Sequence, residues 1–205
     1  SFSASAYHRL GEIQFRLLND FDGALKSYRA ALISASKPKL RKEIQLRIGE
    51  MYLSKGDLDE AQHYFGKLKK NGAKFQYQFI LTQLFSGKID TAFGLLEQEI
   101  ENSQPLSVDF NDLLEFRNFI SQYYHNGTEI DKHAFELFVF GEFYLRQKKL
   151  PESAASYAFV IEHYPDASIS DDAILREALV RLKLNQIPEA EILSEQLTKT
   201  KLADK

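Results

Sequence analysis

One stretch, residues 46–68, constrains the fold of this chain more than any other. Its first half repeats apolar residues at three- and four-residue steps, the pattern of an amphipathic helix. Gly56 can take positive φ and end that helix, and Asp57 with Glu60 forms a candidate capping box for the next. Two short helices joined so closely fold back as an antiparallel hairpin. The two apolar stripes are Leu46, Ile48, Gly49, Tyr52 and Leu53, then Leu58, Ala61, Tyr64, Phe65 and Leu68.

This spacing of small and aromatic residues resembles the tetratricopeptide repeat. The family's first-helix small residue and aromatic fall on Gly49 and Tyr52, its turn glycine on Gly56, and its second-helix pair on Ala61 and Phe65. A single hairpin cannot bury its own apolar face, so the family stacks at least three with a period near 34 residues. The resemblance implies an all-α fold, a right-handed superhelical solenoid of antiparallel helix hairpins.

The rest of the chain repeats this pattern with varying fidelity. The spacing from Phe15 to Ala24 equals that from Tyr52 to Ala61, which indicates an earlier repeat, while Ile80 replaces the small residue in a weaker one. The segment before Asn126 lacks a small residue at hairpin spacing and is either an extra helix or an irregular repeat. We predict one solenoid of about eleven helices over residues 1–205, without strands, with hairpins at about 2–36, 38–71, 73–103, 130–165 and 170–203 and an irregular helix at 106–126.

Composition limits the partners and compartments that the chain can have. A formal net charge of −3 gives no electrostatic reason to expect nucleic acid as a partner. No run approaches the roughly 20 apolar residues of a membrane helix, so we expect no membrane insertion by this segment. The absence of cysteine removes thiolate chemistry without choosing a compartment. The chain opens on Ser1, and we expect a fragment of a longer protein that is cytoplasmic or bacterial periplasmic.

No motif in the sequence predicts catalysis. The five histidines are scattered and lack ligand spacing. Ser34 and Lys37 match an acyl-transfer pattern, but its companion motifs are missing. Acidic clusters near Asp57 and Asp171 begin predicted helices, where capping accounts for them. We therefore expect no enzyme activity, no cofactor and no metal site.

A basic run from Lys37 to Arg47 allows two interpretations. One is a site for an anion or an acidic peptide. The other is a solvated helix face, which we favour because Glu43 and Glu50 dilute the positive charge.

In a curved stack of hairpins, the first helix of each hairpin lines the concave side. Some family members hold a peptide's terminal carboxylate there with paired Lys and Asn, but Leu46 and Glu50 occupy the matching places, so that clamp is absent. The predicted surface is apolar with a few charges, which suits an extended or helical apolar segment. Its predicted partner-binding residues are Arg9, Arg16, Leu46, Glu50, Leu53, Tyr77, Leu81, Leu84, Phe138, Glu142 and Leu145, with Leu175 and Leu179 in the last hairpin.

The sequence favours a non-catalytic scaffold that binds another protein or a peptide segment on this concave face. The alternative is a structural spacer or self-association module, possible as a homo-oligomer, within a larger bacterial envelope or secretion assembly. The segment from Tyr157 to Ala173 is similar to repeats in bacterial cell-envelope proteins, which supports that alternative.

Overall fold

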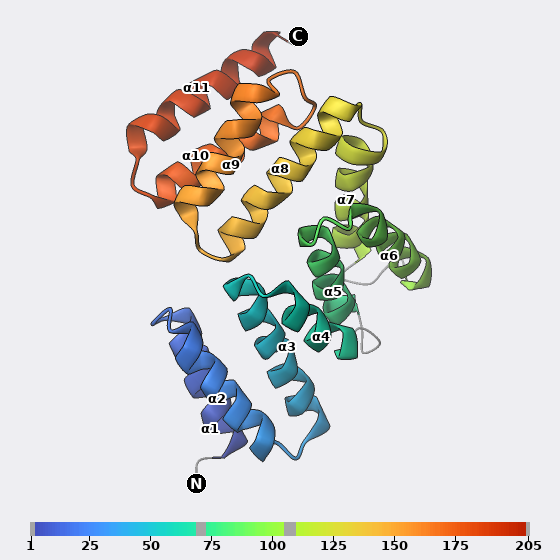
Figure 1. Cartoon of the computed structure of the whole chain (residues 1–205), viewed down its shortest axis with the longest axis vertical. Helices are drawn as coiled ribbons and strands as arrows, with labels where there is room; N and C mark the ends of the chain where they lie inside the picture. Colours follow the sequence, from blue (N-terminus) through green and yellow to red (C-terminus); the bar gives the residue numbers. More distant parts are fainter. Residues whose placement is uncertain (1–2, 69–72, 105–109, 204–205) are drawn as a thin grey trace. The chain divides into compact units, whose positions relative to one another are not determined.

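The computed structural model describes residues 3–68, 73–104 and 110–203 (Figure 1). Within these ranges the chain is helical and contains no strand, so the predicted all-α fold of about eleven helices is confirmed. The predicted ends of two elements, residues 69–71 and 106–109, lie outside the described residues. The α-helices are α1 (Ala4–Arg16), α2 (Phe21–Ser34), α3 (Pro38–Lys55), α4 (Leu58–Leu68), α5 (Ala73–Phe85), α6 (Ile89–Asn102), α7 (Phe110–Ile120), α8 (Glu129–Arg146), α9 (Leu150–His163), α10 (Ser170–Lys183) and α11 (Ile187–Ala203).

The turn inside each hairpin contains one residue with positive φ. In the hairpin of α3 and α4 this residue is Gly56, with φ of 84°, and Asp57 then accepts a hydrogen bond from the Glu60 N–H at 3.2 Å. The predicted helix end and N-cap at these two positions are therefore confirmed. Only Gly56 and its counterpart in the third hairpin are glycines, so the other turns use residues for which this conformation is less favourable. The other four residues are Asn19, Gly87, Lys148 and Asn185.

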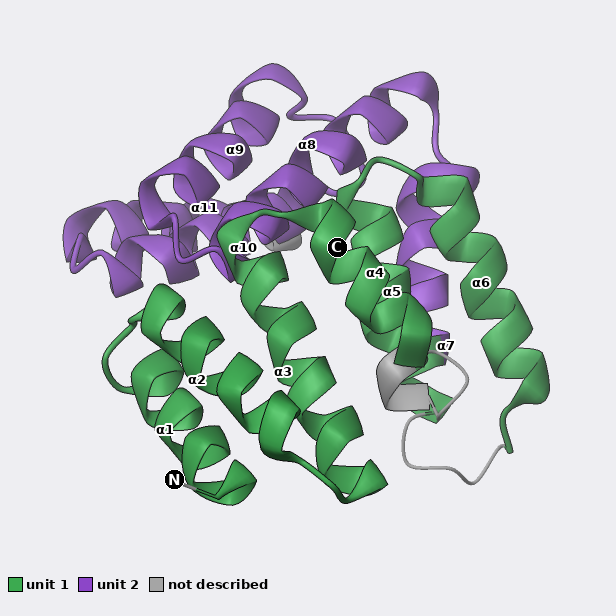
Figure 2. Cartoon of the chain, turned by 60° about the horizontal axis from the view of Figure 1, so that its bottom comes forward, with its two compact units in different colours: residues 1–113 green, residues 114–205 purple. Residues whose placement is uncertain are grey.

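The chain divides into two compact units, residues 1–113 and residues 114–205 (Figure 2). The boundary falls inside α7. In the first unit, each helix from α1 to α5 packs on the next helix in sequence; in the second, each helix from α8 to α10 does the same. Hairpins therefore stack on their neighbours within each unit, as the repeat requires. A single solenoid over residues 1–205 stays a prediction.

A glycine of the first helix lies against an aromatic ring of the second helix in three hairpins. A Cβ built on Gly49 would lie 2.5 Å from the ring of Phe65, and one on Gly141 would lie 2.5 Å from the ring of Tyr157. Gly11 and Tyr28 show the same approach. These three aromatic residues are fully buried. The small residue thus lets two helix backbones close on a large ring, which fills the interior that the hairpin shares with its neighbour.

The irregular segment before α8 continues α7 as a short π-helix, Ser121–His125. A π-helix adds a residue to the turn and rotates the side chains that follow. Within this turn, the Tyr123 hydroxyl donates a hydrogen bond at 2.6 Å to Asp172 of α10. Burial and this carboxylate raise the pKa of Tyr123, so the hydroxyl stays a donor. The segment is thereby tied to the last hairpin of its own unit.

Asp131 joins the start of α8 to the connection between α9 and α10. Its carboxylate accepts hydrogen bonds from the Ser168 N–H at 2.7 Å, from the Thr128 N–H at 2.9 Å and from the Thr128 hydroxyl at 2.8 Å. These donors, Ser168 first and Thr128 next, lower the pKa of Asp131 to about 2. The same residue completes a capping box for α8, because the Asp131 N–H donates to the Thr128 hydroxyl.

We expect Gly141→Ala to lower the free energy of unfolding by about 1–3 kcal/mol, since the new methyl group overlaps the buried Tyr157 ring. Gly94→Ala is the matched control, because Gly94 lies in α6 and a methyl group added there would have nothing within 4 Å. It should stabilise the chain by up to about 1 kcal/mol through helix propensity. Unfolding in urea measures the free energy of unfolding of both variants. An equal decrease in that free energy in the two variants would contradict the close packing of Gly141 on Tyr157.

We expect Asp131→Asn to destabilise the chain by about 1–2 kcal/mol at neutral pH. The folded-state pKa lies below the ordinary value of about 3.9, so the carboxylate stabilises the fold above about pH 4. That contribution is lost as pH falls toward 2. Thermal melting of wild type and variant should therefore converge between pH 4 and pH 2, whereas Asp166→Asn, an exposed control, should follow wild type throughout. A difference in melting temperature between wild type and Asp131→Asn that persists at pH 2 would argue against the Asp131 carboxylate as the source of the stabilisation.

Candidate functional site

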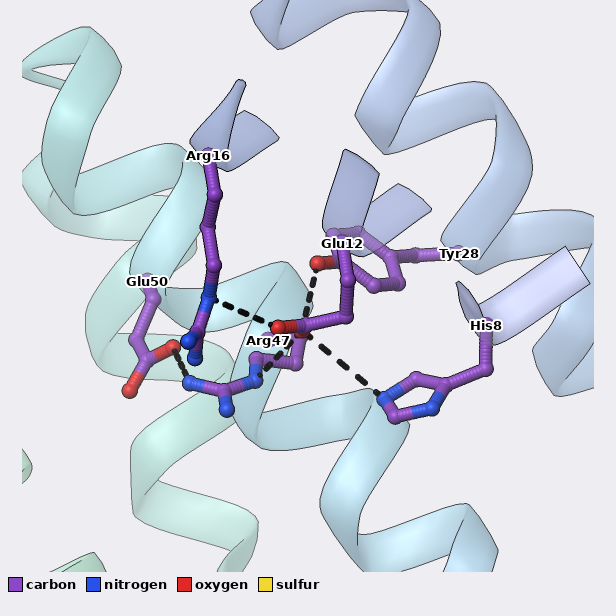
Figure 3. Close-up of polar contacts among 6 residues, drawn as sticks. All are labelled: His8, Glu12, Arg16, Tyr28, Arg47 and Glu50. Carbon is purple, nitrogen blue, oxygen red and sulfur yellow. Dashed lines mark hydrogen bonds and ion pairs between the residues drawn. The ribbon is translucent and has the colours of Figure 1, made fainter. Parts of the chain in front are cut away.

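Three helices of the first unit bring charged side chains together around one carboxylate (Figure 3). Glu12 of α1 accepts a hydrogen bond from the Tyr28 hydroxyl of α2 at 2.7 Å. It forms ion pairs at 2.8 Å with Arg16 of α1 and with Arg47 of α3. Arg47 also donates a hydrogen bond to Glu50 at 2.7 Å. We name this group the Glu12 cluster; its members are His8, Glu12, Arg16, Tyr28, Arg47 and Glu50.

The centre of the Glu12 cluster is largely withdrawn from water. The side chains of Glu12 and Arg47 are 22% and 19% exposed. Burial acts to lower the pKa of Arg47, but its hydrogen bond to Glu50 and the two nearby carboxylates outweigh burial and raise that pKa. Burial, and then the bond to Glu12, raise the pKa of Tyr28, so its hydroxyl remains protonated and donates. Ion pairs in such a site are screened less than pairs at the open surface.

His8 lies at the edge of the Glu12 cluster, beside the ring of Tyr28 (Figure 3). Its ring is 5.8 Å from the ring of Tyr28, and its Nε2 is 4.0 Å from Glu12, which is too long for a hydrogen bond. That nitrogen is buried and has no hydrogen-bond partner. Arg47 Nε lies close to Glu12 but is not aligned for a hydrogen bond, so this contact is mainly electrostatic.

The second unit contains the same arrangement of glutamate, tyrosine and arginine on α8, α9 and α10. Glu142 follows Gly141 on α8, as Glu12 follows Gly11 on α1. It accepts a hydrogen bond from the Tyr157 hydroxyl of α9 at 2.8 Å and forms an ion pair at 2.9 Å with Arg176 of α10. In both units a tyrosine of the second helix and an arginine of the next hairpin meet one glutamate. We name this recurring set the Glu–Tyr–Arg contact.

The hairpin of α3 and α4 keeps the packing but lacks this contact. Glu50 follows Gly49, but the aromatic residue beneath the glycine is Phe65, which has no hydroxyl. Glu50 instead binds Arg47 of its own helix. The ring therefore serves packing in all three hairpins, and its hydroxyl adds the polar contact in two.

The structure divides the predicted partner-binding residues into accessible and buried sets. Arg9 and Arg16 are exposed, while Glu50, Tyr77, Glu142 and Leu145 are partly exposed. The buried set cannot present its side chains to a partner, since stacking of neighbouring helices covers it. The buried residues are Leu46, Leu53, Leu81, Leu84 and Phe138.

Sequence reasoning missed the roles of Glu12 and Arg47 in the first contact and of Arg176 in the second, and it assigned Glu142 to partner binding. Interpreting the basic run as a solvated face fits the exposed lysines but is wrong for Arg47, which is half-buried and paired. The signal that could have found it is the recurrence of Gly-Glu with an arginine about one repeat period later. Arg47 follows Glu12 by 35 residues, and Arg176 follows Glu142 by 34.

The described residues offer no sign of a metal centre or a membrane span. Within residues 3–68, 73–104 and 110–203, no group of three or more His, Cys, Asp or Glu side chains is placed to hold a metal ion. Among the helices described, none combines the length and hydrophobicity needed to cross a membrane.

The sequence model of the tetratricopeptide repeat matches residues 43–70, the segment of α3 and α4. Residues 43–70 form a tetratricopeptide repeat. No curated protein matches the chain. Among solved structures, the chain is similar to MamA, with 17% identity, a TM-score of 0.42 and coverage of 95% of this chain and 96% of that one.

Two further structures share this likeness. One is BtubC (BKLC) from P. vanneervenii, at 13% identity and a TM-score of 0.42, with 97% of this chain and 80% of that chain covered. The other is yeast Tom70, at 15% identity and a TM-score of 0.45, with 96% of this chain and 48% of that chain covered. All three structures have low sequence identity to this chain.

We expect Glu12→Gln to lower the free energy of unfolding by about 1–2 kcal/mol, because it removes a charge that holds Arg47 and Arg16. Glu43→Gln on α3 is the control, since Glu43 is exposed, and it should change stability by less than about 0.5 kcal/mol. A double-mutant cycle of Glu12→Gln with Arg47→Met, read by urea unfolding, should show coupling of at least about 0.5 kcal/mol. Strict additivity would show that the two side chains act independently.

Proposed function

We propose that this chain is a non-catalytic scaffold that holds an apolar segment of a partner protein against the first helices of its hairpins. The observation that carries the proposal is a surface of the second unit on α8 and α10. Leu175 and Leu179 are 45% and 42% exposed there, one turn apart on α10. They lie beside the ion pair of Glu142 and Arg176. We name this surface the α8/α10 face.

The ion pair sets the geometry of the α8/α10 face. It joins Glu142 of α8 to Arg176 of α10, and the next turn of each helix carries Leu145 and Leu179. Leu145 is partly exposed. Apolar anchors bordered by charged groups are the composition of a protein-binding hot spot, where polar neighbours exclude water from the apolar contact. An apolar or amphipathic segment suits this surface better than a strongly charged one.

The predicted partner-binding residues that are exposed or partly exposed are the remaining residues that we propose to contact the partner. Glu142 and Leu145 belong to the α8/α10 face. Arg9, Arg16, Glu50 and Tyr77 belong to the first unit, where they supply charge and one aromatic ring. We assign no direct contact to the buried leucines or to Phe138, whose role is to hold the helices in place.

The state of the carboxylates supports a role without catalysis. A catalytic acid or nucleophile needs room for substrate and a partner that activates it. Glu12 and Glu142 already accept a tyrosine hydroxyl and pair with arginine, so their oxygens are committed to the fold. A tetratricopeptide repeat with its polar groups engaged in this way is suited to holding a partner.

Self-association is a second candidate function, favoured by exposed apolar side chains that include Leu17, which caps the C-terminus of α1, and Ile192 of α11. A place for such an assembly in a bacterial envelope or secretion system stays a prediction from the sequence.

The test uses photo-crosslinking in the source cells, with p-benzoylphenylalanine at Leu179 or, as the control, at Ile33. Ile33 is 86% exposed on α2, in the first unit, and is not part of the α8/α10 face. We expect one defined protein adduct from position 179 and none shared with position 33. A synthetic peptide of the crosslinked segment should bind wild type and lose at least about tenfold in affinity on Leu179→Asp, but not on Ile33→Asp.

Two results would contradict the proposal. One is the same adducts from both positions, which would indicate random collision. The other is peptide binding that survives Leu175→Asp and Leu179→Asp while circular dichroism shows folded protein. An adduct made only of this chain would replace partner binding with self-association.

A further inference from the structure

An exposed asparagine lies at the corner between the π-helix and α8. Asn126 follows the π-helix Ser121–His125 directly, and Gly127 comes next. Asn126 is exposed to solvent. An asparagine that precedes glycine is open to an internal reaction, because glycine has no side chain to hinder the approach of its backbone nitrogen to the asparagine side chain. The corner therefore holds a side-chain amide beside an unhindered backbone nitrogen.

The packing of this corner requires the glycine. A Cβ built on Gly127 would lie 2.7 Å from the Cβ of Asp131 and 2.8 Å from the carbonyl oxygen of Tyr123. Asp131 is held there by the capping box of α8 and by the hydrogen bond from the Ser168 N–H. A larger residue, which would hinder the reaction, could not replace Gly127 unless the corner moved. The contacts that build the corner thus keep Asn126 next to a glycine.

The hydrogen bonds that hold the reacting groups of the corner are long. The Asn126 side-chain amide donates to the Ser121 hydroxyl at 3.2 Å. The Gly127 N–H donates to the Tyr124 carbonyl oxygen at 3.3 Å. Ordinary N–H···O bonds reach about 3.2 Å, so both of these bonds are weak. The ψ angle of Asn126 is −2°, and rotation about it, which breaks these two bonds, brings the Gly127 nitrogen to the side-chain carbon.

We infer that Asn126 is a self-modification site, at which the folded protein converts the side-chain amide into aspartate and isoaspartate with water as the co-reactant. The Gly127 nitrogen forms a bond to Cγ of Asn126, the Cγ–Nδ2 bond breaks, and ammonia leaves with the proton of the Gly127 N–H. The imide ring that results takes up one water. Opening at Cγ gives aspartate. Opening at the main-chain carbonyl gives isoaspartate, in which the main chain runs through the former side chain.

Isoaspartate would loosen the corner, because it lengthens the main chain by one methylene group between two anchored residues. On one side, the Tyr123 hydroxyl is bound to Asp172 of α10. On the other side, Thr128 caps α8. Aspartate leaves the main chain unchanged and replaces only the amide. The inference lies beyond the proposed function, since it uses no residue of the α8/α10 face.

The first test follows the conversion in the full chain. The folded protein is incubated in warm, mildly alkaline buffer, which favours loss of the Gly127 proton. Trypsin then releases residues 118–132 as one peptide for mass spectrometry. Asn118 of the same peptide is the matched control, since it is also exposed but lies inside α7 and precedes Phe119.

We expect Asn126 to convert severalfold faster than Asn118. Its rate should lie within about tenfold of the rate in a synthetic peptide of residues 118–132, because opening of a weakly bonded turn costs little free energy. Equal conversion of the two asparagines would overturn the inference. So would an Asn126 that stays intact in the folded protein while the synthetic peptide converts.

The second test measures the loosening of the corner. Asn126→Gln is one control, since its longer side chain keeps the amide but forms the ring more slowly; Asn126→Asp, which carries one product from the start, is the other. After equal incubation, the melting temperature of wild type should fall further than that of Asn126→Gln, and the purified isoaspartate form should melt below Asn126→Asp. The other Asn-Gly pair, at residues 71–72, lies outside the described residues and is common to all these proteins, so its contribution cancels. Equal decreases in wild type and Asn126→Gln would overturn the loosening.

Discussion

The close approach of paired helices, a small residue against a large ring, is the interaction on which the rest of this structure depends. At Gly11, Gly49 and Gly141 the absent side chain lets the second helix bring an aromatic ring into the space between backbones. The ring is fully buried and supplies the apolar surface that a two-helix unit cannot otherwise enclose. Stacking of successive hairpins then follows, because the same ring lies in an interior that the next hairpin helps to cover.

The tyrosine hydroxyls extend this packing into electrostatics. A buried ring at a fixed depth places its hydroxyl at the rim, where Glu12 or Glu142 accepts its hydrogen bond. That bond orients the carboxylate toward an arginine of the following hairpin. Core packing thereby determines which charged groups meet at the edge of the hairpin interior. A hydrogen bond that restricts a side chain in this way reduces the entropy lost when the ion pair forms.

Local signals predicted the turn and the helix cap between α3 and α4, because turns and caps depend on neighbouring residues. Gly56 and Asp57 have the conformation and hydrogen bond that their chemistry implies. Lys148 was not predictable in the same way, since its positive φ is imposed by the hairpin around it. The π-helix at Ser121–His125 likewise follows from tertiary contacts, including the bond from Tyr123. Burial of Leu46 and Phe138 depends on how far neighbouring helices cover the first helix, which periodicity does not specify.

The Glu–Tyr–Arg contact also limits how a chain of this design can change length. Its glutamate and arginine lie in successive hairpins, about one period apart. An internal duplication of the hairpin of α3 and α4 would keep Arg47 beside Glu12, whereas its deletion would remove that partner, because the next first helix, α5, contains no arginine. A duplication or deletion of only part of a period would rotate the following helices. It would leave a half-buried carboxylate without its arginine and expose apolar surface. Ion pairs, as well as core packing, therefore favour changes of length by whole hairpins.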